Sequence, residues 1–250
     1  MAERIARVGW VVDAQNDFLL PPERGGRLYV HDLFDGGADP GAVRIVPTLV
    51  RAVRWMEAHC EVVVYTGDWH AYGDAEIDPV APDPAKETYP PHCMGLSSDA
   101  AEREGAELIP ELRPRDPLVL ERDATDDDAR RVARAAVDGR RPVFIRKSRF
   151  SVFEGNPAAE AFLRALRERL GAPLEIHVAG VARDVCVRHA VEGMLAEARG
   201  YGVTVVTDAT WGLGIEEERA SLARWADAGA ALVTTAGLEA RARHRAPAAS

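Results

Sequence analysis

Short apolar runs rich in β-branched residues recur along the chain, and most are followed by an amphipathic segment of helical length. Runs of this kind predict buried strands. They lie at residues 7–12, 61–66, 141–146, 174–180, 203–207 and 231–235. Strands that alternate with helices predict a parallel sheet with both faces covered. We therefore expect an α/β fold: a three-layer, doubly wound, mostly parallel sheet of about six strands with helices on both faces.

Two of the intervening segments have the clearest helical pattern. The first has Asn156 at the N-cap position and Pro157 at the first helical position, and it stops at Gly171. The second begins near Asp184 and continues to Gly200. By contrast, residues 70–117 are rich in Pro, Asp and Glu with little apolar periodicity, which predicts a long loop with at most a short helix or two.

The length and composition indicate one globular unit. We expect a single domain over residues 1–240, with the long loop at about 70–117, and a flexible tail at 241–250.

Acids outnumber bases by 40 to 31, so a surface that binds nucleic acid is not expected. No run approaches the ~18 apolar residues of a membrane span, and the first residues resemble no cleavable leader, so we expect a cytoplasmic protein. The 3 cysteines are widely spaced, which is typical of reduced thiols.

Three chemically active side chains follow predicted strands. Ligands of doubly wound sheets bind beyond the carboxyl ends of the strands, and these positions hold Asp13, Lys147 and Cys186. Near the start of a helix, backbone N–H groups would favour the Cys186 thiolate and could hold an oxyanion. Lys147 would keep Asp13 ionised, and Asp13 could accept the thiol proton. Two alternatives remain open: a Cys186–His189 pair within one helix, and a purely structural thiol in an apolar stripe.

A possible metal site follows the second predicted strand. Asp68 and His70 point the same way in an extended segment, and His92 from the long loop could complete a set of two histidines and one carboxylate. Zinc, iron and manganese all suit such a set. Asp74 and Glu76 are spare oxygen ligands, and the sequence does not choose between them.

Seven segments together resemble the isochorismatase-like cysteine hydrolase superfamily. In chain order, from about residue 8 to 236, they are VVDAQNDF, GGRLYV, YTGDWH, YPPHC, RKSRFSVF, VAGVARDVCVRHA and YGVTVVTDAT. The Asp-Trp-His and Pro-Pro-His-Cys motifs resemble its nicotinamidase/pyrazinamidase branch. The resemblance implies a general base, its cationic partner and a nucleophile at Asp13, Lys147 and Cys186. It also implies a metal ion that binds the pyridine nitrogen of the substrate and is held by Asp68, His70 and His92.

The same resemblance implies further roles around the pocket. It places a cis peptide bond at Val181–Ala182 and an oxyanion hole at the amides of Ala182 and Cys186. It also places Phe18 and Trp69 where aromatic side chains flank the substrate ring.

The sequence also departs from the family pattern around the pocket. The connection at residues 25–39 is longer than usual, and Arg183 stands where a small or hydroxyl residue is common. These departures make the substrate less certain than the chemistry. Of the remaining polar residues near the first strand, we expect Asp17 to be a loop acid with local hydrogen bonds. We expect Gln15, which adjoins Asp13, to be an exposed loop residue, with a role in orienting the site as the alternative.

The leading hypothesis is a metal-assisted cysteine amidohydrolase. It would convert nicotinamide, or a similar aromatic carboxamide, to the acid and ammonia through a thioester. The cofactor expected is one divalent metal ion, zinc first, with iron or manganese as alternatives. Another superfamily amidase acting on a different small amide or carbamoyl compound is the main alternative, followed by a metal oxygenase and a catalytically silent binding protein. The expected partner is a small-molecule amide, without nucleic acid or membrane, and a homo-oligomer is left open.

Overall fold

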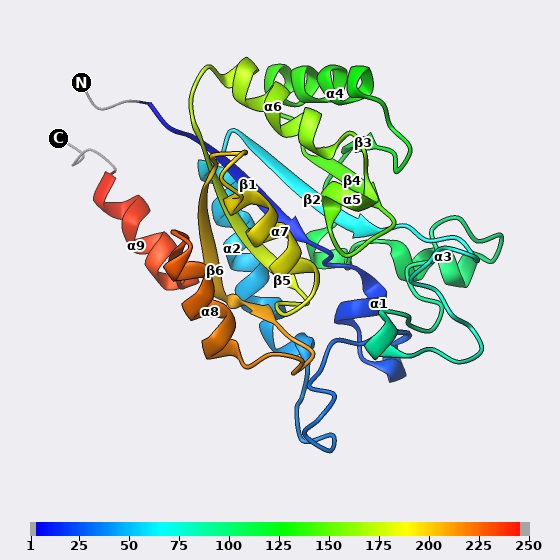
Figure 1. Ribbon diagram of the computed structural model, residues 1–250. Helices are drawn as coiled ribbons and strands as arrows, with labels where there is room; N and C mark the ends of the chain where they lie inside the picture. The colour runs from blue at the N-terminus through cyan, green and yellow to red at the C-terminus, as the bar shows by residue number, and fades with distance from the viewer. Residues whose placement is uncertain (1–3, 246–250) are drawn as a thin grey trace.

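Seven parallel strands form one sheet in the computed structural model, which describes residues 4–245 (Figure 1). The strand order is β3-β4-β2-β1-β5-β6-β7. In chain order the strands are β1 (Ala6–Val12), β2 (Val62–Asp68), β3 (Leu118–Leu120), β4 (Val143–Lys147), β5 (Leu174–Val181), β6 (Gly202–Trp211) and β7 (Ala231–Val233). The predicted doubly wound α/β fold is confirmed. The sheet has one more strand than predicted, because β3 is an edge strand of 3 residues, 2 of them only half-buried.

Helices cover both faces of the sheet (Figure 1). They are α1 (Asn16–Leu19), α2 (Val46–His59), α3 (Ala100–Ala106), α4 (Asp126–Gly139), α5 (Val152–Gly155), α6 (Ala159–Leu170), α7 (Cys186–Leu195), α8 (Glu218–Asp227) and α9 (Thr235–Arg245). Helix α2 packs on the central strands and contacts α9, whereas α4 packs against α6, and α7 against α5 and α8. Right-handed crossovers place the helices that precede β4, β5, β6 and β7 on one face and α2 on the other.

The predicted helix boundaries need three corrections. Asn156 is not the N-cap of α6, which begins at Ala159; its buried side chain instead donates to the carbonyls of Glu121 and Arg146. Helix α7 ends at Leu195 and does not reach Gly200. The predicted tail at 241–250 begins inside α9, and its residues 246–250 lie outside the described part of the chain.

Close packing of α2 on the central strand anchors the sheet. Val8, Trp10 and Val11 of β1 are fully buried, as expected for a strand covered on both faces. At Gly9, an added Cβ would lie 2.8 Å from the Cβ of Met56 in α2, so the helix approaches the strand where a side chain is missing. This packing holds β1 in a fixed position, and therefore also Asp13, the residue that follows β1.

The carboxyl ends of β4, β2, β1 and β5 gather the candidate residues at one edge of the sheet. The register of β2 and β4 pairs Asp68 directly with Lys147. Asp13 follows β1 in the left-handed region, with φ 49°, and its N–H donates to the carbonyl of Thr66 over 3.2 Å. Beyond β5, the Val181–Ala182 peptide bond is cis, which confirms that expectation.

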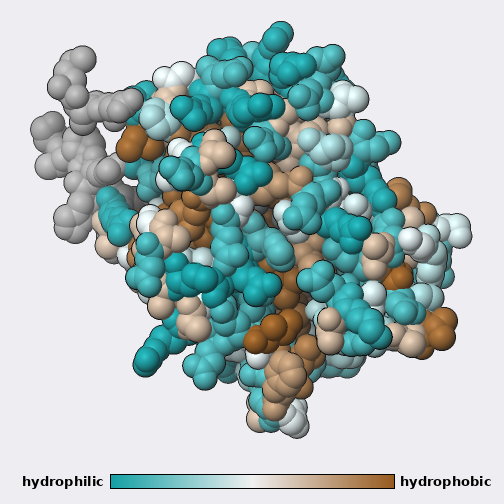
Figure 2. Space-filling view, in the orientation of Figure 1, coloured by the Kyte–Doolittle hydropathy of each residue, from teal (hydrophilic) through white to brown (hydrophobic). Residues whose placement is uncertain are grey.

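Most of the molecular surface in view is hydrophilic, with a strip of apolar surface near the middle of this face (Figure 2). Within residues 4–245, we find no helix that combines the length and the apolarity needed to cross a membrane.

Candidate active site

A buried lysine joins two carboxylates and a thiol at the edge of the sheet. Lys147 Nζ lies 2.9 Å from Asp13 Oδ2, pairs with Asp68 Oδ1, and lies 3.9 Å from Cys186 Sγ. Oxygens of both carboxylates and the sulfur lie within 4.8 Å of one another. The structure therefore brings together Asp13, Lys147 and Cys186, which lie far apart in the sequence.

Burial shapes the electrostatics of these three groups. It raises the pKa of Asp13, although Lys147 and a 2.7 Å hydrogen bond from Thr66 Oγ1 act in the opposite direction. It also raises the pKa of the Cys186 thiol well above its usual value, against the attraction of Lys147. Burial alone would lower the pKa of Lys147, but the two carboxylates raise it well above the ordinary value, so the amine stays charged.

The thiol is therefore protonated in the resting site, and the prediction of a lowered thiol pKa is wrong. The reason is that burial and the charge of Asp13 outweigh the helix terminus on which that prediction depended. A protonated thiol beside a carboxylate with a raised pKa is a suitable pair for proton transfer, because the raised pKa makes Asp13 a stronger base.

Cys186 is the first residue of α7, so it lies in the first turn as predicted, although the helix begins two residues after Asp184. Ala182 and Cys186 both line a cavity at this edge of the sheet. The turn between them is closed by Val187 N–H, which donates to the Ala182 carbonyl over 3.0 Å. The Asp184 carboxylate accepts hydrogen bonds from the N–H groups of Leu213 and Ile215, which attaches the turn to the loop after β6.

Apolar side chains form most of the cavity wall. They are Phe18, Leu28, Val30, Tyr89, Phe150, Ala182, Val185 and Leu213. Phe18 thus lies where the resemblance implied. Tyr89 and Phe150 were not singled out from the sequence, although Tyr89 stands three residues before His92. His189, the alternative partner of the thiol, stacks on Phe150 with ring centroids 6.2 Å apart.

Trp69 does not line the cavity, so its predicted contact with the substrate ring needs correction. Its ring packs edge-on against Phe144 and lies under the Arg146 guanidinium, 3.8 Å from the ring centroid. Side chains alternate along an extended segment, and Asp68 and His70 already face the site. Trp69, between them, has to face the opposite side.

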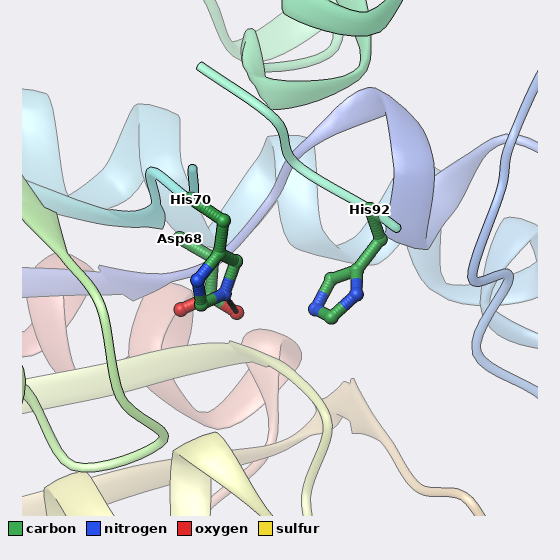
Figure 3. A group of neighbouring side chains, drawn as sticks. All are labelled: Asp68, His70 and His92. Atoms are coloured by element: carbon green, nitrogen blue, oxygen red, sulfur yellow. Dashed lines mark ion pairs between the residues drawn. The ribbon is translucent and has the colours of Figure 1, made fainter. Parts of the chain in front are cut away.

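Asp68, His70 and His92 come together next to the lysine (Figure 3). One ligand atom of each lies within 4.8 Å of the others, and all three side chains are buried. His92 reaches the pair from a separate segment, with its ring directed toward them. Its Nδ1 lies 2.8 Å from the Pro90 carbonyl, and as a donor there it leaves Nε2 free.

Two observations show that this set fits a cation. His70 Nε2 is buried without a hydrogen-bond partner among the described residues, and it faces Asp68 Oδ2 at 3.9 Å. Carboxylates raise the pKa of His70 to about 9 against its burial, whereas burial and repulsion by His70 lower the pKa of His92 to about 4. Two imidazoles beside one carboxylate thus cannot both carry a proton, and a divalent ion would satisfy all three groups.

The two spare carboxylates lie on different sides of His70. Asp74 is held by Arg122 and lies 3.3 Å from His70 Nδ1, behind the ring. Glu76 places Oε2 at 4.0 Å from His70 Nε2, on the ligand side, while its Oε1 accepts from Phe150 N–H. Burial and the charge of Asp68 raise the pKa of Glu76 to about 7.

Gln15 and Asp17 are buried positioning residues, contrary to expectation. Gln15 is not exposed: its side chain accepts from Asp68 N–H over 2.8 Å and donates to the Asp68 carbonyl over 2.7 Å. Asp17 makes a long-range contact, because its Oδ2 accepts from Cys93 N–H over 2.6 Å. It also accepts from Arg27 N–H over 3.2 Å. Asp17 therefore fixes the segment that carries His92.

Asp17→Ala is expected to lower the free energy of unfolding by about 2–3 kcal/mol, because it leaves the buried Cys93 amide without its charged acceptor. Urea unfolding followed by circular dichroism measures this loss. The exposed Asp127→Ala provides the control, with an expected loss below about 1 kcal/mol. Equal losses in the two variants would contradict the assigned role.

The strand order and the flanking helices are those of the isochorismatase-like α/β hydrolase fold. Residues 120–237 match the family model of the isochorismatase domain. This match and the shared fold agree with the resemblance seen in the sequence.

Solved structures of three amidases share this fold. Nicotinamidase/pyrazinamidase from Bacillus subtilis aligns with a TM-score of 0.61 at 19% identity, over 92% of this chain and 100% of that one. Pyrazinamidase from Pyrococcus horikoshii, solved with zinc, gives 0.59 at 23%, over 91% and 98%. N-carbamoylsarcosine amidase from Thermoplasma acidophilum gives 0.59 at 22%, over 92% and 97%. No curated protein matches the chain in sequence.

Proposed function

We propose that the protein is a cysteine amidohydrolase that converts nicotinamide, or a similar small aromatic carboxamide, to the carboxylic acid and ammonia. One observation carries the proposal: the Cys186 sulfur lies within reach of both the Asp13 carboxylate and the Lys147 amine, at the wall of an apolar cavity. That cavity is also lined by Asp68 and His92 of the metal set. The nicotinamidase and pyrazinamidase structures of the same fold support this choice of substrate class.

The reaction follows from the positions of the three buried groups. Asp13 takes the proton from the Cys186 thiol as the sulfur attacks the carboxamide carbon. The N–H groups of Ala182 and Cys186 hold the oxyanion that forms. Asp13 returns the proton to the departing nitrogen, so ammonia leaves and a thioester remains. Asp13 then deprotonates a water molecule that attacks the thioester carbon. The C–S bond breaks to release the acid, and Asp13 returns the proton to the sulfur, which restores the thiol.

Lys147 acts in each step without transferring a proton. Its ammonium lies 2.9 Å from Asp13 Oδ2 and fixes the orientation of that carboxylate, and Thr66 fixes the other oxygen. Because its pKa is raised well above the usual value, it remains a cation throughout.

Asp68, His70 and His92 would hold one divalent ion, with Glu76 as the nearest further oxygen ligand. Zinc is our first choice, with iron and manganese as alternatives. When bound, the ion supplies a Lewis acid that orients the ring through its nitrogen and draws electron density from it.

The cavity wall explains the choice of a small aromatic substrate. Phe18, Tyr89 and Phe150 contribute aromatic rings to the wall, and Leu213 adds an aliphatic side chain. A flat ring gains contact there, whereas a long or charged amide would lose its hydration without a partner.

For this activity we expect a small-molecule partner, no nucleic acid or membrane, and a cytoplasmic location.

Ammonia release by the purified, zinc-loaded protein tests the proposal. Nicotinamide and pyrazinamide should be hydrolysed, and benzamide, which lacks the ring nitrogen, should be a much poorer substrate. If N-carbamoylsarcosine is hydrolysed and nicotinamide is not, the second candidate holds. This is a carbamoyl amidase, and it is favoured by the equal similarity to the Thermoplasma acidophilum enzyme. If none of these amides releases ammonia, the proposal fails.

A further inference from the structure

We propose that Arg122 is a positioning residue that sets the metal affinity of the site through Asp74 and His70. The inference rests on the metal set of the proposed function, but it does not depend on which amide is the substrate. Arg122 follows the short edge strand β3, at a distance of 48 residues from Asp74 in the chain.

The guanidinium of Arg122 holds the Asp74 carboxylate with two hydrogen bonds. Nη1 donates to Oδ2 over 2.7 Å, and Nη2 donates to Oδ1 over 2.9 Å. Nη1 also donates to the Trp69 carbonyl over 2.9 Å. A two-pronged contact of this kind fixes the plane of the carboxylate as well as its position. Arg122 therefore holds both ends of the turn that leaves β2.

The same carboxylate continues the chain of contacts to the first histidine. Asp74 Oδ2 accepts from Ala71 N–H over 2.9 Å and lies 3.3 Å from His70 Nδ1. When Nδ1 carries the proton, it donates a hydrogen bond to Asp74. Nε2 is then unprotonated, and its lone pair faces Asp68 and is available to bind a metal ion. A carboxylate behind a ligating imidazole both selects this tautomer and makes the ring more basic.

The second histidine is held differently. His92 Nδ1 lies near a backbone carbonyl, that of Pro90, and its orientation follows from the fold of its own segment. His70 instead depends on the Asp74 side chain from its own loop, which is held in turn by Arg122 from beyond β3. Removing Arg122 would free Asp74 to turn toward solvent and His70 to change tautomer or rotate.

Arg146 provides a matched control for Arg122. It is exposed to a similar extent, 22% against 25%, and it also makes an ion pair with a carboxylate, Glu121. Its guanidinium stacks on the Trp69 ring. Among the described residues, its side chain pairs with Glu121, and not with Asp74 or His70, and it lies over Trp69 and Phe144. Arg146→Met should therefore show the general structural effects of losing an arginine in this region, without the effect on His70.

The zinc dissociation constant, measured by competition with a chromophoric chelator, tests the inference. Arg122→Met should weaken zinc binding by about 10- to 100-fold, as expected for loss of an outer-shell partner. Arg122→Lys should fall between this variant and the wild type, because an ammonium makes a single contact with Asp74. Arg146→Met should stay within about twofold of the wild type. The double variant Arg122→Met with Asp74→Ala should bind zinc no more weakly than Asp74→Ala alone, since both act through one contact.

The outcomes separate this inference from the proposed function. If the wild type does not compete with the chelator for zinc, the zinc site and this inference both fail, whereas the nicotinamide assignment is decided separately by ammonia release. If the wild type binds zinc but Arg122→Met binds it equally well, or no more weakly than Arg146→Met, the inference alone is overturned. Unfolding midpoints of the zinc-free variants identify any that do not fold, and Arg122→Lys then decides the result.

Discussion

Replacing Cys186 with alanine is expected to reduce ammonia release by more than about a thousandfold, because the reaction loses its nucleophile and Cys93, the other thiol in the electrostatic field of Asp13 and Lys147, does not line the cavity. The fold should be retained, since the change removes one sulfur from the start of a helix. The rate is measured with the zinc-loaded variant, and circular dichroism verifies its structure. Acid quenching of the wild type during turnover should trap the acyl group on the peptide that contains Cys186.

Cys60 provides the control for this experiment. Its thiol is also buried, and burial raises its pKa to about 12, but it follows α2 at the opposite end of β2 from Asp68. Cys60→Ala should retain activity within about twofold. If Cys186→Ala keeps its activity and that activity needs oxygen, the thiol is structural and the metal oxygenase alternative is correct.

The sequence predicted the fold well because its inner strands are long and apolar, and it missed one short strand at the edge of the sheet. Val62–Asp68 and Leu174–Val181 are almost entirely buried, so their composition alone identifies them. β3 has 3 residues at the edge of the sheet, and its pattern does not differ from that of a loop. The omission matters, because β3 is the strand that brings Arg122 to Asp74.

The position of the site could be predicted for the same reason as the fold. Parallel strands end at one edge, so the residues that follow β1, β2 and β4 had to be neighbours. Alternation along the strand could also have excluded Trp69 from the cavity, once Asp68 and His70 were assigned to one face. The side chains that come from the long loop could not be placed in this way, because long-range contacts such as that of Asp17 with Cys93 position them.

Electrostatics is the part of the site that the sequence predicted least well. The sequence shows which charged groups follow each strand and where the helix begins, and from these features we predicted a lowered pKa for the Cys186 thiol. It does not show how completely the groups are buried, and burial is the largest influence on both Asp13 and Cys186. As a result, the proton starts on the sulfur, and the base acts on a neutral thiol.

His92→Ala is expected to weaken zinc binding by at least about a hundredfold, because the variant keeps only two of the three ligands. Hydrolysis of nicotinamide should fall to a similar extent at low substrate concentration, since the ring nitrogen loses its partner. Zinc competition and ammonia release measure the two effects separately. Treating the wild type with a chelator should reproduce the loss of activity, and added zinc should restore it.

The control for this second prediction is His189→Ala. His189 is half-buried on α7 and stacks on Phe150 at the cavity wall, but it is not part of the metal set. Its loss should leave zinc affinity unchanged and alter activity by less than about tenfold. A His189→Ala variant as inactive as Cys186→Ala would instead support the cysteine–histidine pair. If His92→Ala and the chelated wild type both hydrolyse nicotinamide at the full rate, the ring is held by the apolar wall alone, and the metal has no part in the reaction.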